Sequence, residues 1–213
     1  MATWIKAGFW EKLCKPCQGY KGWLNLDELI QSLAPPAPEP AYKVYTALLT
    51  QSGGSNYIYI SSSPLTIGVT YLIAHNQNND ADFTNVGAPN NDIGTYFVAT
   101  GTTPNSWGTG TVDLRYDEGA PVVTVLENTI GNIWFTYDYV GTYQMKSDGL
   151  FTQNKTFLIC TGLVPPLGDP ISTLQLSRTS DNSLQLITYN NSFGSQDSAL
   201  EVDSASIEIR VYN

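Results

Sequence analysis

Ile207-Glu-Ile-Arg-Val-Tyr212, near the end of the printed sequence, alternates aliphatic residues with charged or aromatic ones. A repeat of two residues places successive side chains on opposite faces of a β-strand, so this run predicts a strand with one buried face. Leu174-Gln-Leu-Ser177 shows the same alternation. Between Tyr42 and Ile207, short runs rich in Val, Ile, Thr, Tyr and Phe are separated by Gly, Asn, Pro and Ser, which favour turns.

These runs predict an all-β fold for residues 42–213, with the architecture of a β-sandwich or a jelly-roll-like domain. The predicted strands lie near Lys43–Gln51, Asn56–Ile60, Val69–His75, Thr95–Thr100, Thr111–Tyr116, Val122–Glu127, Ile133–Tyr137, Thr142–Lys146, Lys155–Thr161, Ser172–Arg178, Ser183–Tyr189 and Ser206–Tyr212.

The charge distribution excludes two classes of partner for residues 42–213. The net charge of the chain is -9. Residues 1–41 are neutral, because four lysines balance Glu11, Asp27, Glu28 and Glu39. All the net negative charge therefore lies in residues 42–213, which lack the clustered Lys and Arg that nucleic-acid phosphates require. An anionic membrane surface would repel the same region.

The sequence contains no apolar run of about 18 residues, the length that a membrane-spanning helix needs. Its first residues have scattered lysines and no continuous apolar stretch, so we expect no signal peptide. We therefore expect synthesis in a cytoplasm and exit by another route, such as cell lysis.

Residues 1–34 form a predicted anchoring segment, unusually rich in tryptophan. Asn25 and Glu28 match the N-cap and capping-box positions of a helix, and leucine and isoleucine then recur at helical spacing. This short amphipathic helix would be marginal alone and needs a partner. The predicted partner-binding residues are Trp4, Phe9, Trp10, Trp23, Leu26, Leu29 and Ile30. The proline-rich residues 35–41 predict a stiff, extended linker.

Three runs resemble, in order, a module of structural proteins from tailed phages of Bacteroidetes hosts, crAss-like phages included. They are Tyr42-Lys-Val-Tyr-Thr-Ala-Leu-Leu-Thr-Gln-Ser52, Ala120-Pro-Val-Val-Thr-Val-Leu-Glu-Asn-Thr129, and a pattern from Gly141-Thr-Tyr through Phe151 to Asn154-Lys-Thr-Phe157. Residues 53–119 separate the first two runs and predict an inserted β module. That insert resembles another recurring phage unit in Leu65–Tyr71, Asp82–Ala88 and Ala99–Pro104.

The resemblance covers roughly residues 42–160. It implies a virion component made in the host cytoplasm, with a head fibre or capsid decoration protein as the nearest function. It also implies a homotrimer, since phage fibres are commonly trimers, and a capsid or other virion protein as the partner of the N-terminal segment. The family contributes no known catalytic residue or cofactor, so no enzymatic activity is expected.

The cysteines and the single histidine give little indication of a catalytic or metal site. Cys14-Lys-Pro-Cys17 lacks the strand-then-helix context of a redox pair, and a zinc site needs two further ligands. Packing or an incidental disulfide is favoured, while redox and zinc roles stay open as alternatives. His75, the single histidine, has no nucleophile motif beside it. No metal or cofactor is expected.

Two polar or aromatic patterns are candidate sites. Asn78-Asn-Asp80-Ala-Asp82 alternates oxygen ligands as a calcium loop does, but Phe83 occupies the position where an EF-hand has Gly, which favours a polar turn. Asn56-Tyr-Ile-Tyr59 and Phe135-Thr-Tyr-Asp-Tyr139 would display rings on one sheet face, either for packing or as a platform for sugars or proteins. An adhesin for host surface glycans is therefore the alternative to a virion structural protein.

Overall fold

The computed structural model divides the chain into two compact units, 1–40 and 41–213, and we describe each by itself. The structure describes residues 4–6, 23–25, 41–51, 53–62, 64–161, 173–189, 194–195, 197, 200 and 205–213.

The described part of the first unit is a pair of short antiparallel strands, β1 (Trp4–Lys6) and β2 (Trp23–Asn25). Ile5 lies opposite Leu24 in their register. The sequence did not predict these strands. The predicted helix that follows Asn25 and the predicted linker 35–41 lie almost entirely outside the described residues.

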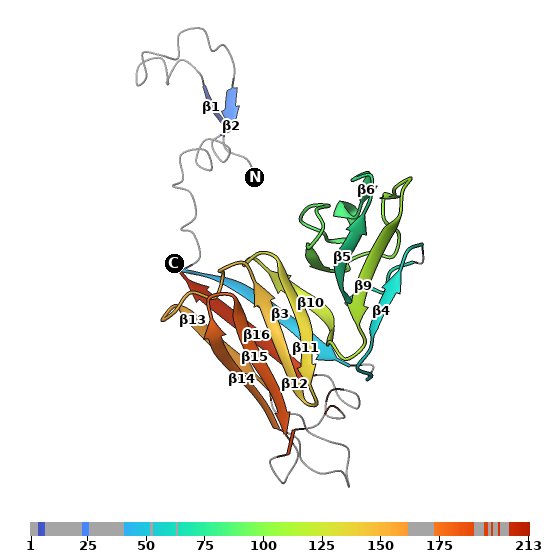
Figure 1. The fold of residues 1–213 in the computed structure, drawn as a ribbon. Coiled ribbons are helices and arrows are strands. Elements are labelled where there is room, and N and C mark those ends of the chain that lie inside the picture. Colours follow the sequence, from blue (N-terminus) through green and yellow to red (C-terminus); the bar gives the residue numbers. More distant parts are fainter. Residues whose placement is uncertain are drawn as a thin grey trace, which may run out of the picture. The chain divides into compact units, whose positions relative to one another are not determined.

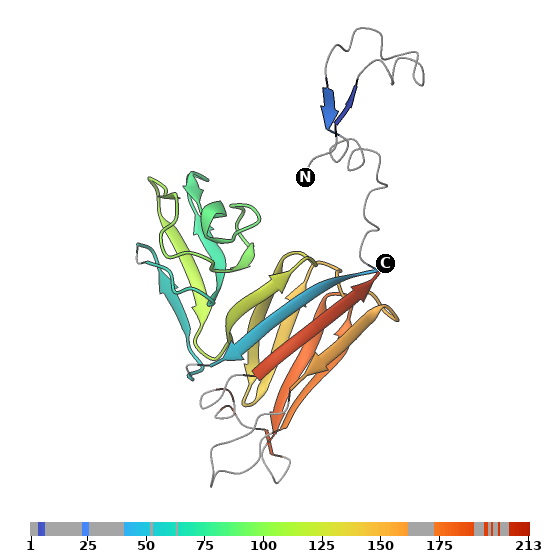
Figure 2. The same ribbon diagram turned by 180° about the vertical axis from the view of Figure 1, so that it is seen from behind.

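The second unit begins with a sheet that joins segments distant in the sequence. Its strand order among the described residues is β10-β3-β16-β13, all antiparallel. The central strands lie side by side in Figure 2, where β3 is blue and β16 is red. The strands are β3 (Tyr42–Thr50), β10 (Val122–Asn128), β13 (Thr156–Cys160) and β16 (Ala205–Tyr212).

A second antiparallel sheet has the order β11-β12-β15-β14, so β11 is an edge strand. Its strands are labelled in Figure 1. The strands are β11 (Ile133–Tyr139), β12 (Thr142–Ser147), β14 (Thr173–Ser180) and β15 (Ser183–Tyr189).

Both sheets contribute side chains to one hydrophobic core. Tyr45, Ala47 and Leu49 alternate along β3 and are buried, and Ile207 and Ile209 do the same along β16. The second sheet adds to the same cluster Phe135, Tyr143, Met145, Leu184 and Leu186. The alternation that predicted these strands therefore places their apolar residues in one shared core.

Residues between β3 and β10 form a further antiparallel sheet, ordered β4-β9-β5-β7, which we call the insert sheet. It has a hydrophobic core of its own, built around Ile73, Phe83, Phe97 and Leu114. A turn of 3-10 helix at Thr84–Val86 and the strand pair β6-β8 supply the side chains that cover one face. The strands are β4 (Tyr57–Ile60), β5 (Thr70–Asn76), β6 (Ala81–Asp82), β7 (Tyr96–Val98), β8 (Ser106–Trp107) and β9 (Val112–Asp117).

Hydrogen bonds join the insert to the first sheet, at β10 and just after β3. The amide of Val123 in β10 donates to the carbonyl oxygen of Gly68 at 2.9 Å. Gly68 has a φ of 86°, and a Cβ built there would lie 2.5 Å from the carbonyl oxygen of Val123. Glycine is therefore needed for this close approach. The side-chain amide of Gln51 donates to the Gly119 carbonyl, which ties the two ends of the insert together at 3.0 Å.

The prediction of an all-β fold is confirmed for the described residues, and each predicted strand is present with ends shifted by a few residues at most. The short strands β1, β2, β6 and β8 were not predicted. No helix in the described part of the chain is long and apolar enough to cross a membrane.

Candidate functional site

A small open cleft of about 50 Å³ lies between the insert sheet and the edge strand β11. Aromatic rings and two charged groups line most of it, a combination typical of ligand sites. The lining residues are Tyr57, Thr70, Tyr96, Arg115, Tyr116, Asp117, Phe135 and Thr136.

The insert sheet builds one wall of the cleft through its strand register. Tyr59 of β4 lies opposite Arg115 of β9, Arg115 opposite Leu72 of β5, and Leu72 opposite Tyr96 of β7. Cross-strand partners share a face, so these four residues form a row across the whole sheet. Val112 and Leu114 alternate with Arg115 along β9 and are buried on the other face. The face opposite the core of the insert is thus aromatic and polar.

Arg115 lies in the middle of this row and is held by three tyrosines. Its guanidinium lies 4.6 Å from the ring centroid of Tyr57, a cation–π contact. One of its N–H groups donates to the Tyr96 hydroxyl at 3.2 Å. Burial lowers the pKa of Arg115, but its hydrogen bond to Tyr59 and the nearby Tyr96 outweigh burial and raise it. The cleft therefore keeps a fixed, oriented cation.

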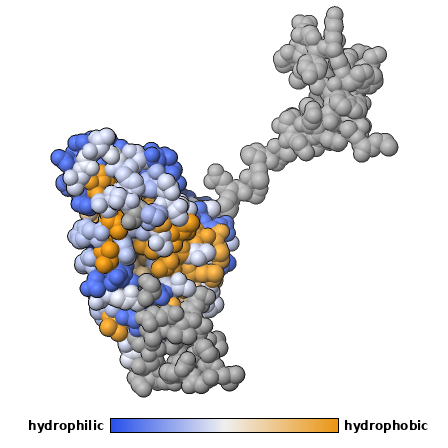
Figure 3. All heavy atoms as spheres, turned by 90° about the vertical axis from the view of Figure 1, so that its right-hand side faces the viewer, coloured by the Kyte–Doolittle hydropathy of each residue, from blue (hydrophilic) through white to orange (hydrophobic). Residues whose placement is uncertain are grey.

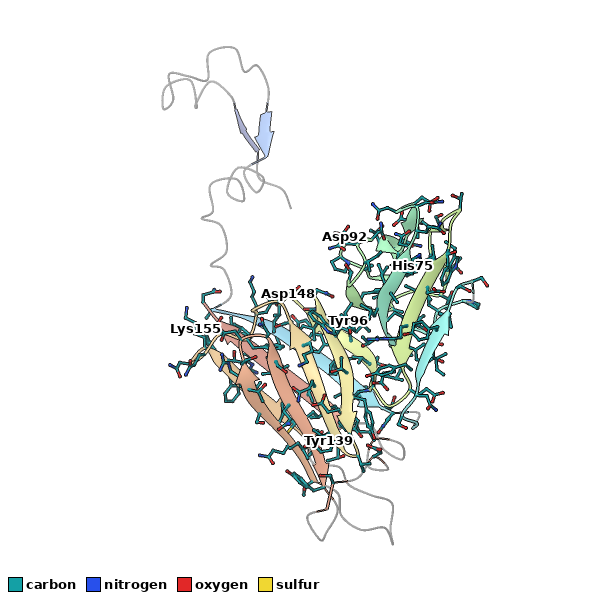
Figure 4. The ribbon with its side chains drawn as sticks, viewed as in Figure 1. His75, Asp92, Tyr96, Tyr139, Asp148 and Lys155 are labelled. Carbon is teal, nitrogen blue, oxygen red and sulfur yellow. The ribbon has the colours of Figure 1, made fainter. Side chains whose placement is uncertain are left out.

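Tyr96 connects the cleft to β11. Its ring stacks on that of Trp134 with the centroids 5.6 Å apart and the planes 9° from parallel. The side-chain amide of Asn132 donates to the Tyr96 carbonyl oxygen at 3.0 Å. Figure 4 shows Tyr96 where the insert meets the sheet that contains β11. Stacked rings have few rotatable bonds, so this side of the cleft is preorganised.

Asp117 and Thr70 satisfy the exposed edge of β11. The Phe135 amide donates to the Thr70 hydroxyl oxygen at 3.1 Å. Burial raises the pKa of the Asp117 carboxyl, although hydrogen bonds from the amides of Gly119 and Tyr137 and the charge of Arg115 oppose that rise. An unpaired edge strand would otherwise present free N–H groups. These contacts hold β11 beside the cleft, and Asp117 and Thr70 also line it.

Two exposed tyrosine rings of β4 lie on this face of the insert sheet: Tyr57 lines the cleft, and Tyr59 lies beside it, opposite Arg115. Tyr57 and Tyr59 are 59% and 60% exposed, whereas Ile60 from the alternate face packs on the insert core. The rings therefore offer flat apolar area beside the guanidinium of Arg115. This arrangement suits a small polar ligand with one apolar face, because it combines ring surface with oriented donors.

The predicted anchoring residues are only partly within the described chain. Trp4 lies in β1 and Trp23 in β2, opposite Asn25 and Lys6 respectively. Phe9, Trp10, Leu26, Leu29 and Ile30 lie outside the described residues, as do Cys14 and Cys17.

The predicted polar turn near Asp82 closes on itself through hydrogen bonds. One carboxylate oxygen of Asp82 accepts from the amide of Thr84 at 3.0 Å and from its hydroxyl at 2.6 Å. The other accepts from the side-chain amide of Asn105 at 2.9 Å. Asp80 likewise accepts from Thr109. These donors occupy the carboxylates, and no group of His, Cys, Asp and Glu suited to a metal occurs among the described residues.

The single histidine and the third cysteine lie apart from the cleft. His75 is exposed near the end of β5 (Figure 4), where Asp113 is its register partner. Cys160 is a free, partly buried thiol on β13. Neither residue lines the cleft.

An apolar surface lies elsewhere, on the first sheet. Phe157 and Ile159 alternate along the edge strand β13 and are substantially exposed, as is Leu126 on the opposite edge strand β10. Between them, Glu208 and Arg210 of β16 form an ion pair. Figure 3 shows hydrophobic residues gathered over part of the described surface. Exposed apolar side chains of this size are available for contacts with another protein.

The display of Tyr57 and Tyr59 was predicted as one of two options, but their partners in the cleft were not. Val112 and Leu114 are apolar residues two positions apart and mark the core face of β9. Arg115 follows Leu114 directly, so the sequence indicates that it lies on the other face. No sequence pattern brings Arg115 to Tyr96 and Trp134, because this meeting depends on long-range strand pairing.

Comparison of the chain with protein-family models, curated proteins and solved structures finds no match.

Proposed function

We propose that this chain is a structural protein of a phage particle, of the head fibre or capsid decoration kind, located in the virion and without enzymatic activity. In this proposal the N-terminal segment attaches to the capsid or another virion protein, and residues 42–213 project outward. The observation that supports it best is the division of the chain at Pro40 into two compact units. A proline-rich stretch at that boundary suits a tether between an attached and a projecting part.

The shared core supports a finer description of the projecting part. We propose that the sheets β10-β3-β16-β13 and β11-β12-β15-β14 form a β-sandwich, because residues from both join one hydrophobic cluster. The amphipathic helix predicted after Asn25 would belong to the anchor.

The homotrimer is part of the same proposal. The exposed apolar residues Leu126, Phe157 and Ile159 are available for contacts between copies.

Alanine at Trp10 or Trp23 tests the anchor. Large aromatic residues dominate the energetics of interfaces, so each variant is expected to lower the copy number on purified particles about tenfold. Quantitative mass spectrometry of particles gives that number. Tyr139→Ala is the matched control, because Tyr139 is an aromatic residue 59% exposed on the second unit. Full occupancy by the Trp10 and Trp23 variants would overturn the anchor assignment.

A second function, adhesion to host surface glycans, is favoured by the aromatic cleft. Tyrosine platforms with nearby polar groups are common in binding surfaces, because the rings supply area at small entropic cost. Both functions are compatible in one protein, since attachment and adhesion would use different units.

A further inference from the structure

We propose that the cleft between the insert sheet and β11 binds a neutral pyranose unit of a glycan, with Tyr57 and Arg115 as its principal contacts. This inference rests on the second proposed function and adds the site and the class of sugar. It is independent of whether the N-terminal segment attaches to a capsid.

The size and openness of the cleft favour the edge of a sugar over a buried cofactor. Its volume of about 50 Å³ cannot enclose a molecule of cofactor size, for which pockets of about 300 Å³ or more are usual. The exposed rings of Tyr57 and Tyr59 extend the binding surface outward along β4. The C–H face of a pyranose is flat and apolar and can cover such a ring while its hydroxyls stay in water.

Hydroxyl recognition needs donors and acceptors that the protein has not fully used. The Arg115 guanidinium has several N–H donors, and the hydroxyl oxygens of Tyr96 and Tyr59 take only some of them. Asp117 accepts from two backbone amides, which leaves acceptor positions on its two carboxylate oxygens. Donors and acceptors side by side suit the vicinal hydroxyls of a sugar.

Local charge selects neutral sugars over acidic ones. On β9 and the turn after it, Asp113, Asp117 and Glu118 outnumber the single cation Arg115. The net charge of the whole chain is also -9. A sugar carboxylate or sulfate would therefore approach against a negative field, whereas a neutral hexose would not.

The test uses the full-length protein on an array that carries neutral hexose, deoxyhexose and N-acetylhexosamine glycans beside sialylated and uronic-acid glycans. Binding is expected within the neutral set. Tyr57→Ala and Arg115→Lys should each weaken binding to the best neutral glycan about tenfold, because one loses a stacking ring and the other the planar guanidinium. Thermal unfolding of each variant establishes that it is folded.

Two further variants sharpen the result. Tyr59→Ala removes the other exposed ring of β4 together with its hydrogen bond to Arg115, and it should also weaken binding. Tyr139→Ala should bind as the unchanged protein does, because Tyr139 is equally exposed but does not line the cleft and lies away from Tyr96 in Figure 4.

The outcomes separate the site from the function. One outcome is that Tyr57→Ala, Tyr59→Ala and Arg115→Lys all leave glycan binding unchanged. That result would overturn the assignment of the cleft as the binding site but leave the proposal of adhesion standing. Binding to no glycan would overturn adhesion and the cleft together. Preference for acidic glycans would overturn the choice of neutral sugars. Particle occupancy is measured separately and depends on none of these results.

Discussion

The two-sheet part of the second unit and its insert bury their strands in different ways. In the two-sheet part, both sheets contribute side chains to one core that includes Leu49 and Leu184. The insert has one main sheet, whose core face is covered by loops carrying Phe83 and Val86. Its other face bears the row around Arg115 and lies beside the edge strand β11. No second sheet covers this face among the described residues, so its aromatic and polar residues stay accessible, and the cleft lies where they approach β11.

Polar groups also stabilise the two parts differently. In the two-sheet part, the buried Tyr143 hydroxyl donates to Gln51 at 2.6 Å and lies 3.0 Å from a carboxylate oxygen of Asp197. In the insert, half-buried Asp82 and exposed Asn105 hold the loops together. One network is enclosed by the core, where a broken hydrogen bond is costly, and the other is in contact with water.

Leu184→Ala and Leu114→Ala should show the largest effects and compare the two cores directly. Both leucines are fully buried on central strands, β15 and β9. Such truncations usually lower the free energy of unfolding by about 2 to 5 kcal/mol. We expect Leu184→Ala near the upper end, because strands of two sheets supply its core and limit collapse into the cavity. Leu114→Ala should be nearer the lower end, because loops relax more easily.

Urea unfolding at neutral pH measures both values. An equal or larger loss for Leu114→Ala would show that the core of the insert is as rigid as the shared core, and the proposed difference between the two parts would be wrong.

The two parts were also predictable to different degrees. Strands such as β3 and β16 were correctly predicted because one face is buried, which imposes an alternation that a single sequence reveals. The short strands β6 and β8 were missed. Each has only two residues, and they exist because Asp82 and its partners fix the loops. Hydrogen bonds between loops leave no periodic signal.

The cleft illustrates the same limit. The exposed tyrosines of β4 follow from alternation along one strand, which the sequence contains. The stacking of Tyr96 on Trp134 joins residues of two different sheets. It depends on how the insert packs against β11, a property of the whole fold and not of any local pattern.

Tyr143→Phe and Tyr45→Phe should change the free energy of unfolding by different amounts, although both remove one hydroxyl from the two-sheet part. Both tyrosines are fully buried in the shared core. The Tyr45 hydroxyl has no hydrogen-bond partner among the described residues, whereas Tyr143 contacts Gln51 and Asp197. Removing the Tyr143 hydroxyl leaves polar groups unsatisfied and should lower the free energy of unfolding by about 2 kcal/mol.

Tyr45→Phe removes an unpaired buried hydroxyl and should change the same quantity by less than about 0.5 kcal/mol, or raise it. Urea unfolding of the two variants compares the loss of the same hydroxyl group at two positions. Equal losses for the two variants would mean that the hydrogen bonds of Tyr143 add nothing to stability.

The smallest expected effect is on how stability changes with pH under acidic conditions, which depends on two carboxylates of the insert. Hydrogen bonds from Thr84 first, and then from Asn105, hold the pKa of Asp82 well below its ordinary value of 3.8. A lowered pKa in the folded state contributes stability that is complete above the unfolded value and is lost as the pH falls below it. Asp117 has the opposite sign, because burial raises its pKa and protonation then favours the folded state as the pH falls.

Asp82→Asn should therefore flatten the decline of the unfolding temperature between about pH 5 and pH 3, whereas Asp117→Asn should steepen it. Calorimetry at several pH values measures both slopes, and Asp92→Asn serves as the control because Asp92 lies on the insert outside the Asp82 network. Slopes that change in the same direction for Asp82→Asn and Asp117→Asn would contradict the assigned environments. A difference in sign would show that the loop network is stabilised by its carboxylate charge, while the junction beside the cleft keeps Asp117 at a cost in stability.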